Sequence, residues 1–182
     1  MKTYKLVRIA VFAAMLCAVA PFAVYIGPVP LTFGTFIIYM AGGVLGKKQA
    51  AVAVSVYILL GAFGLPVFSG FSGGFGKLAG ATGGYLIGYI PLAYLSGIFT
   101  DSDAATARSD NLGMALGALG MVIGTLALYT LGTIWFMLQS HTPLIPSLML
   151  CVVPFLPGDA VKITASAVLA PIVRRRVGRL SA

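Results

Sequence analysis

The chain has 182 residues, of which 59% are hydrophobic and 9% are charged, and its mean hydropathy is +1.02. Such values exclude an ordinary soluble domain, because a soluble fold of this size needs more charge on its surface. The formal net charge of +8 does not indicate nucleic-acid binding, since the basic residues stand at the ends of apolar segments and leave no basic face to follow phosphates. One histidine and no glutamate leave little material for a metal site or for acid–base catalysis.

We expect an all-α membrane protein with one domain, residues 1–182, because a helical span needs about 20 apolar residues. The predicted spans cover residues 3–20, 35–45, 49–64, 85–99, 112–138 and 147–173. The last of them has Pro154 and Pro157 as candidate positions for a break.

Small residues recur at intervals of four in the first span, at Ala10, Ala14 and Ala18. Such a stripe permits close approach of another helix, either within this protein or in a partner subunit. The fifth span carries a second set of small residues, which predicts a tightly packed face: Gly113, Gly117, Gly120 and Gly124.

Two Gly/Pro/aromatic segments, 21–34 and 65–84, are too apolar to be simple exposed connectors. The second is long, and its Phe68, Phe71 and Phe75 favour a packed lid over disorder. The distribution of Lys and Arg places both termini in the cytoplasm and these two segments, with the loop 139–146, outside. Lys77 is then a lone basic residue on the outer side and a candidate ligand contact.

The last predicted span holds Asp159 and Lys162, whose spacing of three places them on one face of a helix. Ionisable groups inside a membrane are expensive and usually functional, although a mutual ion pair that only neutralises the two charges is the alternative. A carboxylate can accept N–H groups of a ureido or amide, and an ammonium can donate to a carbonyl or carboxylate. Tyr85, at the end of the lid segment, offers a ring and a hydroxyl to the same ligand. Six short spans without an internal repeat favour a binding subunit that depends on other proteins for transport, while a homodimer could also supply the second half.

Four segments resemble the BioY family of biotin-specific substrate-binding (S) components of energy-coupling factor transporters: GPVPLTFGT (27–35), GLPVFSGFSGG (64–74), GATGGYLIGY (80–89) and PFLPGDAVK (154–162). They occur in the family's order and extend over nearly the whole chain. Gly34 stands where the family often has Gln, which puts one polar ligand contact in doubt, and Ala81 replaces a Pro of a turn.

The resemblance implies a six-helix bundle that binds biotin near the outer face of the cell membrane, beneath the loops after spans 1 and 3. It implies docking through the stripe Ala10, Ala14 and Ala18 on a transmembrane coupling protein, which acts with two ATP-binding-cassette ATPases. No cofactor or metal is expected, and membrane lipid surrounds the protein. The expected ligand contacts are Asp159, Lys162, Tyr85, Thr35, Phe33, Phe71, Gly74, Lys77 and Gly84.

Alternatives to this interpretation are a solitary homo-oligomeric biotin carrier, an S component for another vitamin, an intramembrane enzyme and a structural scaffold. An enzyme would need a nucleophile and a base, or a metal set, that this chain does not offer. The sequence also lacks the GxxxxGK[ST] phosphate loop, so the chain should not hydrolyse ATP itself.

Overall fold

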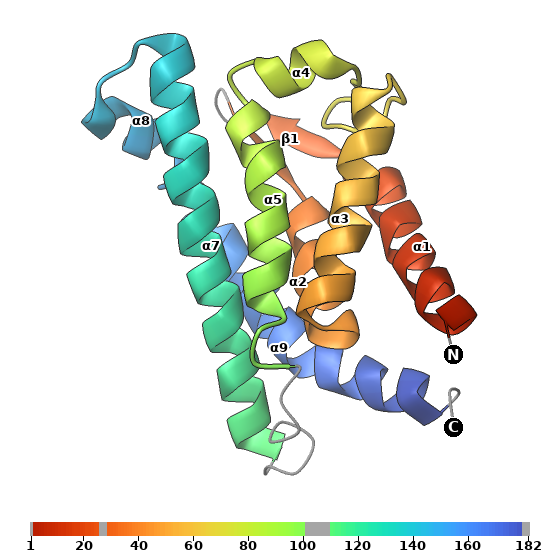
Figure 1. The fold of residues 1–182 in the computed structure, drawn as a ribbon. Coiled ribbons are helices and arrows are strands. Elements are labelled where there is room, and N and C mark those ends of the chain that lie inside the picture. The colour runs from red at the N-terminus through yellow and green to blue at the C-terminus, as the bar shows by residue number, and fades with distance from the viewer. Residues whose placement is uncertain (1, 26–28, 101–109, 180–182) are drawn as a thin grey trace.

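The computed structural model describes residues 2–25, 29–100 and 110–179, and this part of the chain is mostly helical, as the sequence predicts (Figure 1). Within it the chain forms eight helices: α1 (Lys2–Val19), α2 (Gly34–Leu45), α3 (Lys47–Ala62), α4 (Phe75–Ala79), α5 (Gly83–Ser96), α7 (Asp110–Ser140), α8 (Leu144–Cys151) and α9 (Leu156–Arg179). A two-stranded antiparallel hairpin, β1 (Ala23–Tyr25) and β2 (Pro30–Thr32), pairs Ala23 with Thr32.

Helix α2 lies at the centre of the bundle, where ten of its twelve residues are buried. Its glycines explain the close packing. A Cβ atom on Gly42 would lie 2.7 Å from the Cβ of Ser96, and one on Gly43 would lie 2.5 Å from the Cβ of Ala170. Both distances are far inside van der Waals contact, so α2 approaches α5 and α9 with its backbone.

The tight packing predicted for the glycine face of α7 is observed at Gly120 and Gly124. A Cβ atom on Gly120 would lie 2.8 Å from the carbonyl oxygen of Leu95, and one on Gly124 would lie 3.0 Å from that of Leu92. Gly117 differs, because a Cβ atom there would have no described atom within 4 Å. The reason is that α5 ends at Ser96, opposite Gly120, and α7 extends beyond it.

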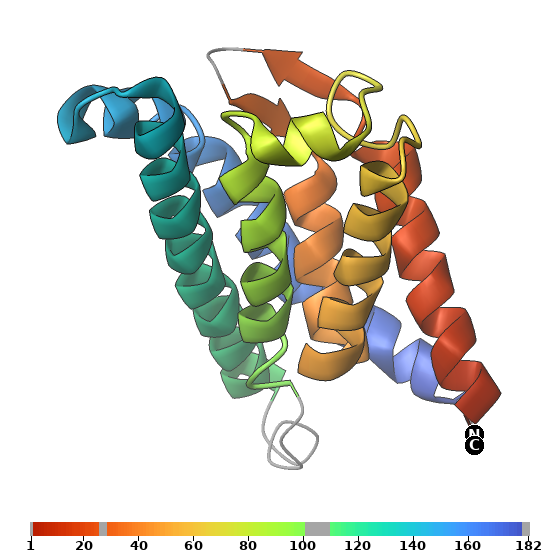
Figure 2. The ribbon, with the colours of Figure 1, turned by 45° about the horizontal axis from the view of Figure 1, so that its top comes forward.

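The hairpin, α4 and α8 lie at one end of the bundle, which we call the hairpin end (Figures 1 and 2). The described ends of the chain lie together at the opposite end. There the Tyr4 hydroxyl donates to the carbonyl of Val177 over 2.7 Å, and the Arg8 guanidinium donates to the carbonyl of Val44 over 3.0 Å. These bonds join α1 to the ends of α9 and α2.

The segment predicted as one span, 147–173, is divided between two helices. Helix α8 ends at Cys151, a turn follows over 152–155, and α9 begins at Leu156. The break falls at Pro154, because the residue before a proline is disfavoured in helical conformation. The same break places Asp159 in the first turn of α9.

Two helical segments of the described chain are long and apolar enough to cross a membrane, Leu112–Ser140 and Leu156–Val177. Helices α2, α3 and α5 have 12, 16 and 14 residues, fewer than the roughly 20 that a perpendicular span requires. The arrangement with six spans therefore stays a prediction.

Candidate functional site

A cavity opens between the hairpin, the first turns of α2 and α9, the first half of α5 and residues 128–129 in the interior of α7. The space inside it, including the part that is open to solvent at its mouth, is about 610 Å³. Tyrosines and apolar side chains form much of the wall. The lining residues are Ala20, Val29, Pro30, Thr32, Thr35, Tyr57, Ser69, Thr82, Tyr85, Leu86, Tyr89, Leu128, Tyr129, Phe155, Asp159 and Lys162.

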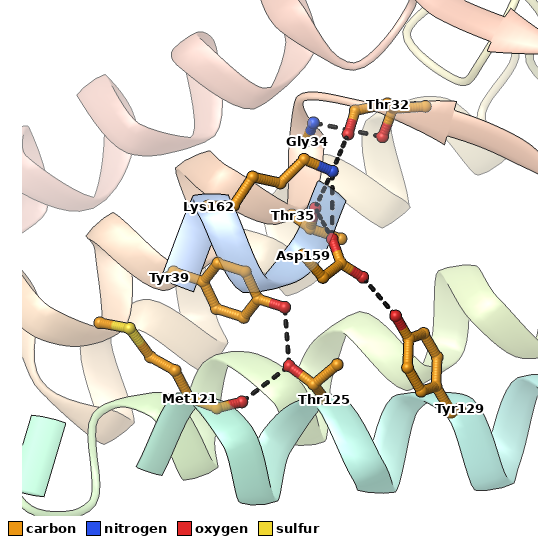
Figure 3. A network of polar contacts seen from close by, with 9 residues as sticks. All are labelled: Thr32, Gly34, Thr35, Tyr39, Met121, Thr125, Tyr129, Asp159 and Lys162. Carbon is orange, nitrogen blue, oxygen red and sulfur yellow. Dashed lines mark hydrogen bonds and ion pairs between the residues drawn. The ribbon is translucent and has the colours of Figure 1, made fainter. Parts of the chain in front are cut away.

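Asp159 and Lys162 meet in this cavity as an ion pair, with Lys162 Nζ 3.1 Å from Asp159 Oδ1. They stand about one turn apart on α9 and are only 4% and 9% exposed. The ammonium also donates to the carbonyl of Thr32 over 2.8 Å and to the hydroxyl of Thr35 over 3.0 Å. Lys162 therefore joins α9 to the hairpin and to the start of α2 (Figure 3).

The carboxylate of Asp159 is held from two further helices. Its Oδ1 accepts a hydrogen bond from the Thr35 hydroxyl at 3.3 Å, and its Oδ2 accepts one from the Tyr129 hydroxyl at 2.6 Å (Figure 3). Thr35 belongs to α2 and Tyr129 to α7, so three helices converge on one carboxylate. Such a set of partners offsets the cost of burying the charge, because every bond to it is charge-assisted.

A second polar contact lies beside this network and is separate from the cavity wall. The hydroxyls of Tyr39 and Thr125 lie 2.7 Å apart, and Thr125 donates to the carbonyl of Met121 over 2.8 Å (Figure 3). Tyr39 is fully buried and is not among the residues that line the cavity in the described chain. We therefore assign it to the bundle core.

Tyr85 lies in the cavity wall as a fixed element. Its hydroxyl lies 3.2 Å from the Thr133 hydroxyl and donates to the carbonyl of Cys151 over 3.2 Å. The ring covers Gly132, where a Cβ atom would lie 2.4 Å from a ring carbon. The absence of a side chain at position 132 thus makes room for the tyrosine.

Of the nine predicted ligand contacts, Asp159, Lys162, Thr35 and Tyr85 line the cavity. The other five are not among its lining residues in the described part of the chain: Phe33, Phe71, Gly74, Lys77 and Gly84. Gly84 has a packing role, since a Cβ atom there would lie 2.2 Å from the Cβ of Trp135. Phe33 stands directly before α2 and is exposed.

The segment predicted as a lid, 65–84, is more regular than expected. It contains α4 and a bridge between Phe68 and Ser72. Phe68 is packed as expected, with its ring edge-on to Tyr57 at 5.6 Å, but Phe71 and Phe75 are 59% and 74% exposed. The packed character of the lid therefore rests on Phe68.

Two hydrogen bonds attach the C-terminal part of the segment 65–84 to helix α7. The Trp135 indole donates to the carbonyl of Gly80 over 3.0 Å, and the Gln139 amide donates to the carbonyl of Ala79. Phe71 contacts the region after α1, where its ring meets Phe22 edge-on at 5.3 Å. The segment is thus attached to the bundle on two sides.

The alanine stripe of α1 is exposed at all three positions, Ala10, Ala14 and Ala18. Larger apolar side chains on the same helix, including Val7 and Val11, are exposed as well. The stripe therefore does not serve helix packing within this chain. Of the two interpretations of its sequence, contact with a partner subunit is the one that is left.

Sequence reasoning missed Tyr129 as a site residue. A signal was present, because Thr125, Tyr129 and Thr133 recur every four residues in an otherwise apolar segment. Hydroxyls at that interval share one helix face. All three are buried, and each bonds a different part of the site or its support.

The described residues contain no group of three or more His, Cys, Asp or Glu side chains able to hold a metal ion. The cavity wall combines tyrosines and apolar side chains with a few fixed hydrogen-bonding groups, a composition common in small-molecule sites.

The chain is similar to known proteins along almost its whole length. The family model of the BioY family matches residues 1–179. The chain is 34% identical over 166 residues to "Biotin transporter BioY" of Thermotoga maritima, a match that covers 91% of this chain and 93% of that protein. It is 33% identical to "Probable biotin transporter BioY" of Pyrococcus horikoshii, covering 93% of this chain and 96% of that protein.

A solved structure has the same fold. It is a crystal structure of the S-component for biotin from an ECF-type ABC transporter, and the superposition has a TM-score of 0.82. The two proteins are 29% identical, and the match covers 96% of this chain and 92% of the other.

Proposed function

The chain belongs to the BioY family, and we propose that it is the biotin-binding S component of an energy-coupling factor transporter. One observation carries the proposal: a buried Asp159–Lys162 pair lies in a cavity walled by tyrosines, in a chain whose relatives are named biotin transporters. A structural scaffold gives no reason to place two charges against such a cavity.

In this proposal Asp159 accepts an N–H of the ureido ring of biotin, because a carboxylate is the strongest acceptor for such a donor. Tyr85 and Tyr89 supply ring surface to the apolar body of the vitamin. A contact from Lys162, which the family resemblance implies, would replace one of its three bonds to the protein. Contacts from Phe33, Phe71, Gly74, Lys77 and Gly84 would follow only from closure of the hairpin and of the segment 65–84 over the ligand.

The proposed orientation in the cell membrane places the hairpin end outside and the termini in the cytoplasm, with six spans. The basic residues support it, because the start of α1, the start of α3 and the end of α9 lie opposite the hairpin (Figure 1). These helix ends carry Lys5, Arg8, Lys47, Lys48, Arg174, Arg175 and Arg176. Biotin would then enter the cavity from outside, beside the hairpin.

The proposed partners are a transmembrane coupling protein and two ATP-binding-cassette ATPases. The exposed stripe Ala10, Ala14 and Ala18 supports docking on the coupling protein, because small residues allow a second helix to approach closely. The chain itself would catalyse no reaction and need no cofactor, and ATP would be hydrolysed by the partners.

Two alternative functions can be distinguished from the proposed one by measuring biotin uptake and ligand competition. A solitary homo-oligomeric carrier would take up biotin in cells that lack the coupling protein and the ATPases, whereas an S component would bind it without net uptake. An S component for another vitamin would bind biotin weakly and lose it to that vitamin in competition.

The direct test is equilibrium binding of biotin to the purified protein in detergent, in parallel with a panel of other vitamins. We expect saturable one-site binding that the other vitamins do not displace. A folded protein that binds no biotin would overturn the proposed function.

A further inference from the structure

Tyr129 contributes to the cavity in a way that neither the sequence nor the family comparison assigns. It stands on α7, far along the chain from Asp159, and its side chain lines the cavity. Its hydroxyl donates to Asp159 Oδ2 over 2.6 Å, a distance typical of a strong bond between a hydroxyl and a carboxylate (Figure 3).

The donors of the ion pair are already occupied by the protein. An ammonium has three N–H bonds, and those of Lys162 meet three acceptors: the Thr32 carbonyl, the Thr35 hydroxyl and Asp159 Oδ1. The hydrogen of the Thr35 hydroxyl is also used, since it points to Asp159 Oδ1. A ligand that meets this network without rearranging it finds acceptors rather than donors.

The open acceptor positions are on the side of Tyr129. Asp159 Oδ1 takes two hydrogen bonds, from Lys162 and Thr35, while Oδ2 takes one from Tyr129. A carboxylate oxygen can accept about two hydrogen bonds, and a phenol that donates its proton can still accept. Asp159 Oδ2 and Tyr129 Oη are therefore neighbouring acceptors 2.6 Å apart at the cavity wall.

We propose that Tyr129 Oη and Asp159 Oδ2 together accept one N–H of the ligand, which makes Tyr129 a residue that determines specificity for an N–H donor. This inference rests on the proposed function and deepens it. Two acceptors so close together attract an N–H group and repel an ether or carbonyl oxygen placed at the same point. The pair thus distinguishes a ureido nitrogen from an isosteric oxygen.

The experiment compares Tyr129→Phe, which keeps the ring and removes the hydroxyl, with Tyr39→Phe as its matched control. Tyr39 is also a buried tyrosine bonded to a hydroxyl of the protein, but it lies outside the cavity wall. The probes are biotin and two cyclic carbamate analogues, in each of which one ureido N–H is replaced by oxygen. Dissociation constants are measured for the parent and both variants.

We expect Tyr129→Phe to bind biotin at least tenfold more weakly, and Tyr39→Phe to stay within about threefold of the parent. The preference for biotin is the ratio of the dissociation constant of a carbamate to that of biotin. For one of the two carbamates, this ratio should be at least threefold smaller in Tyr129→Phe than in the parent. Parental affinity for biotin in Tyr129→Phe would overturn the inference, as would unchanged preferences for both carbamates. If the parent protein binds biotin, both of these results overturn only the role of Tyr129 and leave the proposed function intact. If the parent protein does not bind biotin, the proposed function itself is overturned.

Discussion

Lys162 Nζ lies 3.1 Å from Asp159 Oδ1 across one turn of α9, and the two groups together form bonds to α2, α7 and the hairpin. The pair is thus both a structural junction and the polar part of the cavity wall. Some substitutions change only the charge of the pair, others only a hydrogen bond to it, and others only the packing of the cavity wall. Comparing them separates the structural role of the pair from its role in binding.

Asp159→Asn is expected to weaken biotin binding by at least about 1.5 kcal/mol, because the neutral amide is a poorer acceptor for an N–H donor than the carboxylate. Ser166→Ala is the control on the same helix. Ser166 is buried, its hydroxyl has no hydrogen-bond partner within the described chain, and it does not line the cavity. Calorimetric titration measures both variants, and equal affinity of Asp159→Asn and the parent would reduce the pair to a structural element.

Lys162→Met is expected to destabilise the protein by about 3–5 kcal/mol, because it leaves the buried Asp159 carboxylate without its counter-charge. Adding Asp159→Asn to this variant removes the uncompensated charge and should recover part of the stability. The recovered protein should still bind biotin poorly, since the carboxylate is gone. Unfolding in detergent measures the first effect and titration the second; a double variant less stable than Lys162→Met would contradict the account.

Thr35→Val should reduce both stability, by about 1–3 kcal/mol, and biotin affinity, because the Thr35 hydroxyl accepts from Lys162 and donates to Asp159. Thr35→Ser keeps the hydroxyl and is expected to stay close to the parent in both measurements. If the serine variant lost as much as the valine variant, the methyl group of Thr35 would matter as much as its hydroxyl, and the hydrogen bonds alone would not explain its role.

Gly132→Ala should destabilise the protein by about 1–3 kcal/mol and weaken binding, since its Cβ would overlap the ring of Tyr85 at 2.4 Å. Gly117→Ala on the same helix has no described atom within 4 Å of the new methyl group. Alanine is favoured over glycine in a helix by about 1 kcal/mol, so this control should be as stable as the parent or more stable. Thermal unfolding measures the stability of both variants. A Gly132→Ala protein more stable than the parent would contradict the prediction and show that the Tyr85 ring can move away from the new methyl group.

Ala14→Leu should impair biotin uptake by the complete transporter while leaving biotin binding unchanged. Ala14 is exposed on α1 and lies away from the cavity, so a larger side chain interferes with a docked helix but not with the ligand. Ala115→Leu, at an exposed position of α7, is the matched control and should transport normally. Normal uptake by Ala14→Leu would argue against docking through the stripe.

Part of the candidate site could be predicted from the sequence, because charge is rare in this chain. Asp159 and Lys162 stand out in an apolar segment, and their spacing of three dictates a shared helix face. Their placement beside Tyr85 and Thr35 required only that segments at the same end of the bundle meet. The helical class followed from the apolar composition in the same way.

The contacts of the loops could not be predicted, because they depend on which side chains find partners across the bundle. Phe68, Phe71 and Phe75 are the same residue type in one segment, yet of the three only Phe68 is fully buried, and its ring packs edge-on against Tyr57. The hairpin was likewise missed, since two strands of three residues carry almost no alternation pattern. Tyr129 was missed because a single tyrosine in an apolar helix is usually a core residue.

The bond from Lys162 to the hairpin ends on the backbone carbonyl of Thr32 rather than on its side chain. Every amino acid offers that acceptor, proline included. Position 32 can therefore change during evolution without breaking this attachment, and no compensating change at position 162 is required. Related sequences should accordingly show little covariation between the two positions for this contact, although they lie side by side in the folded protein.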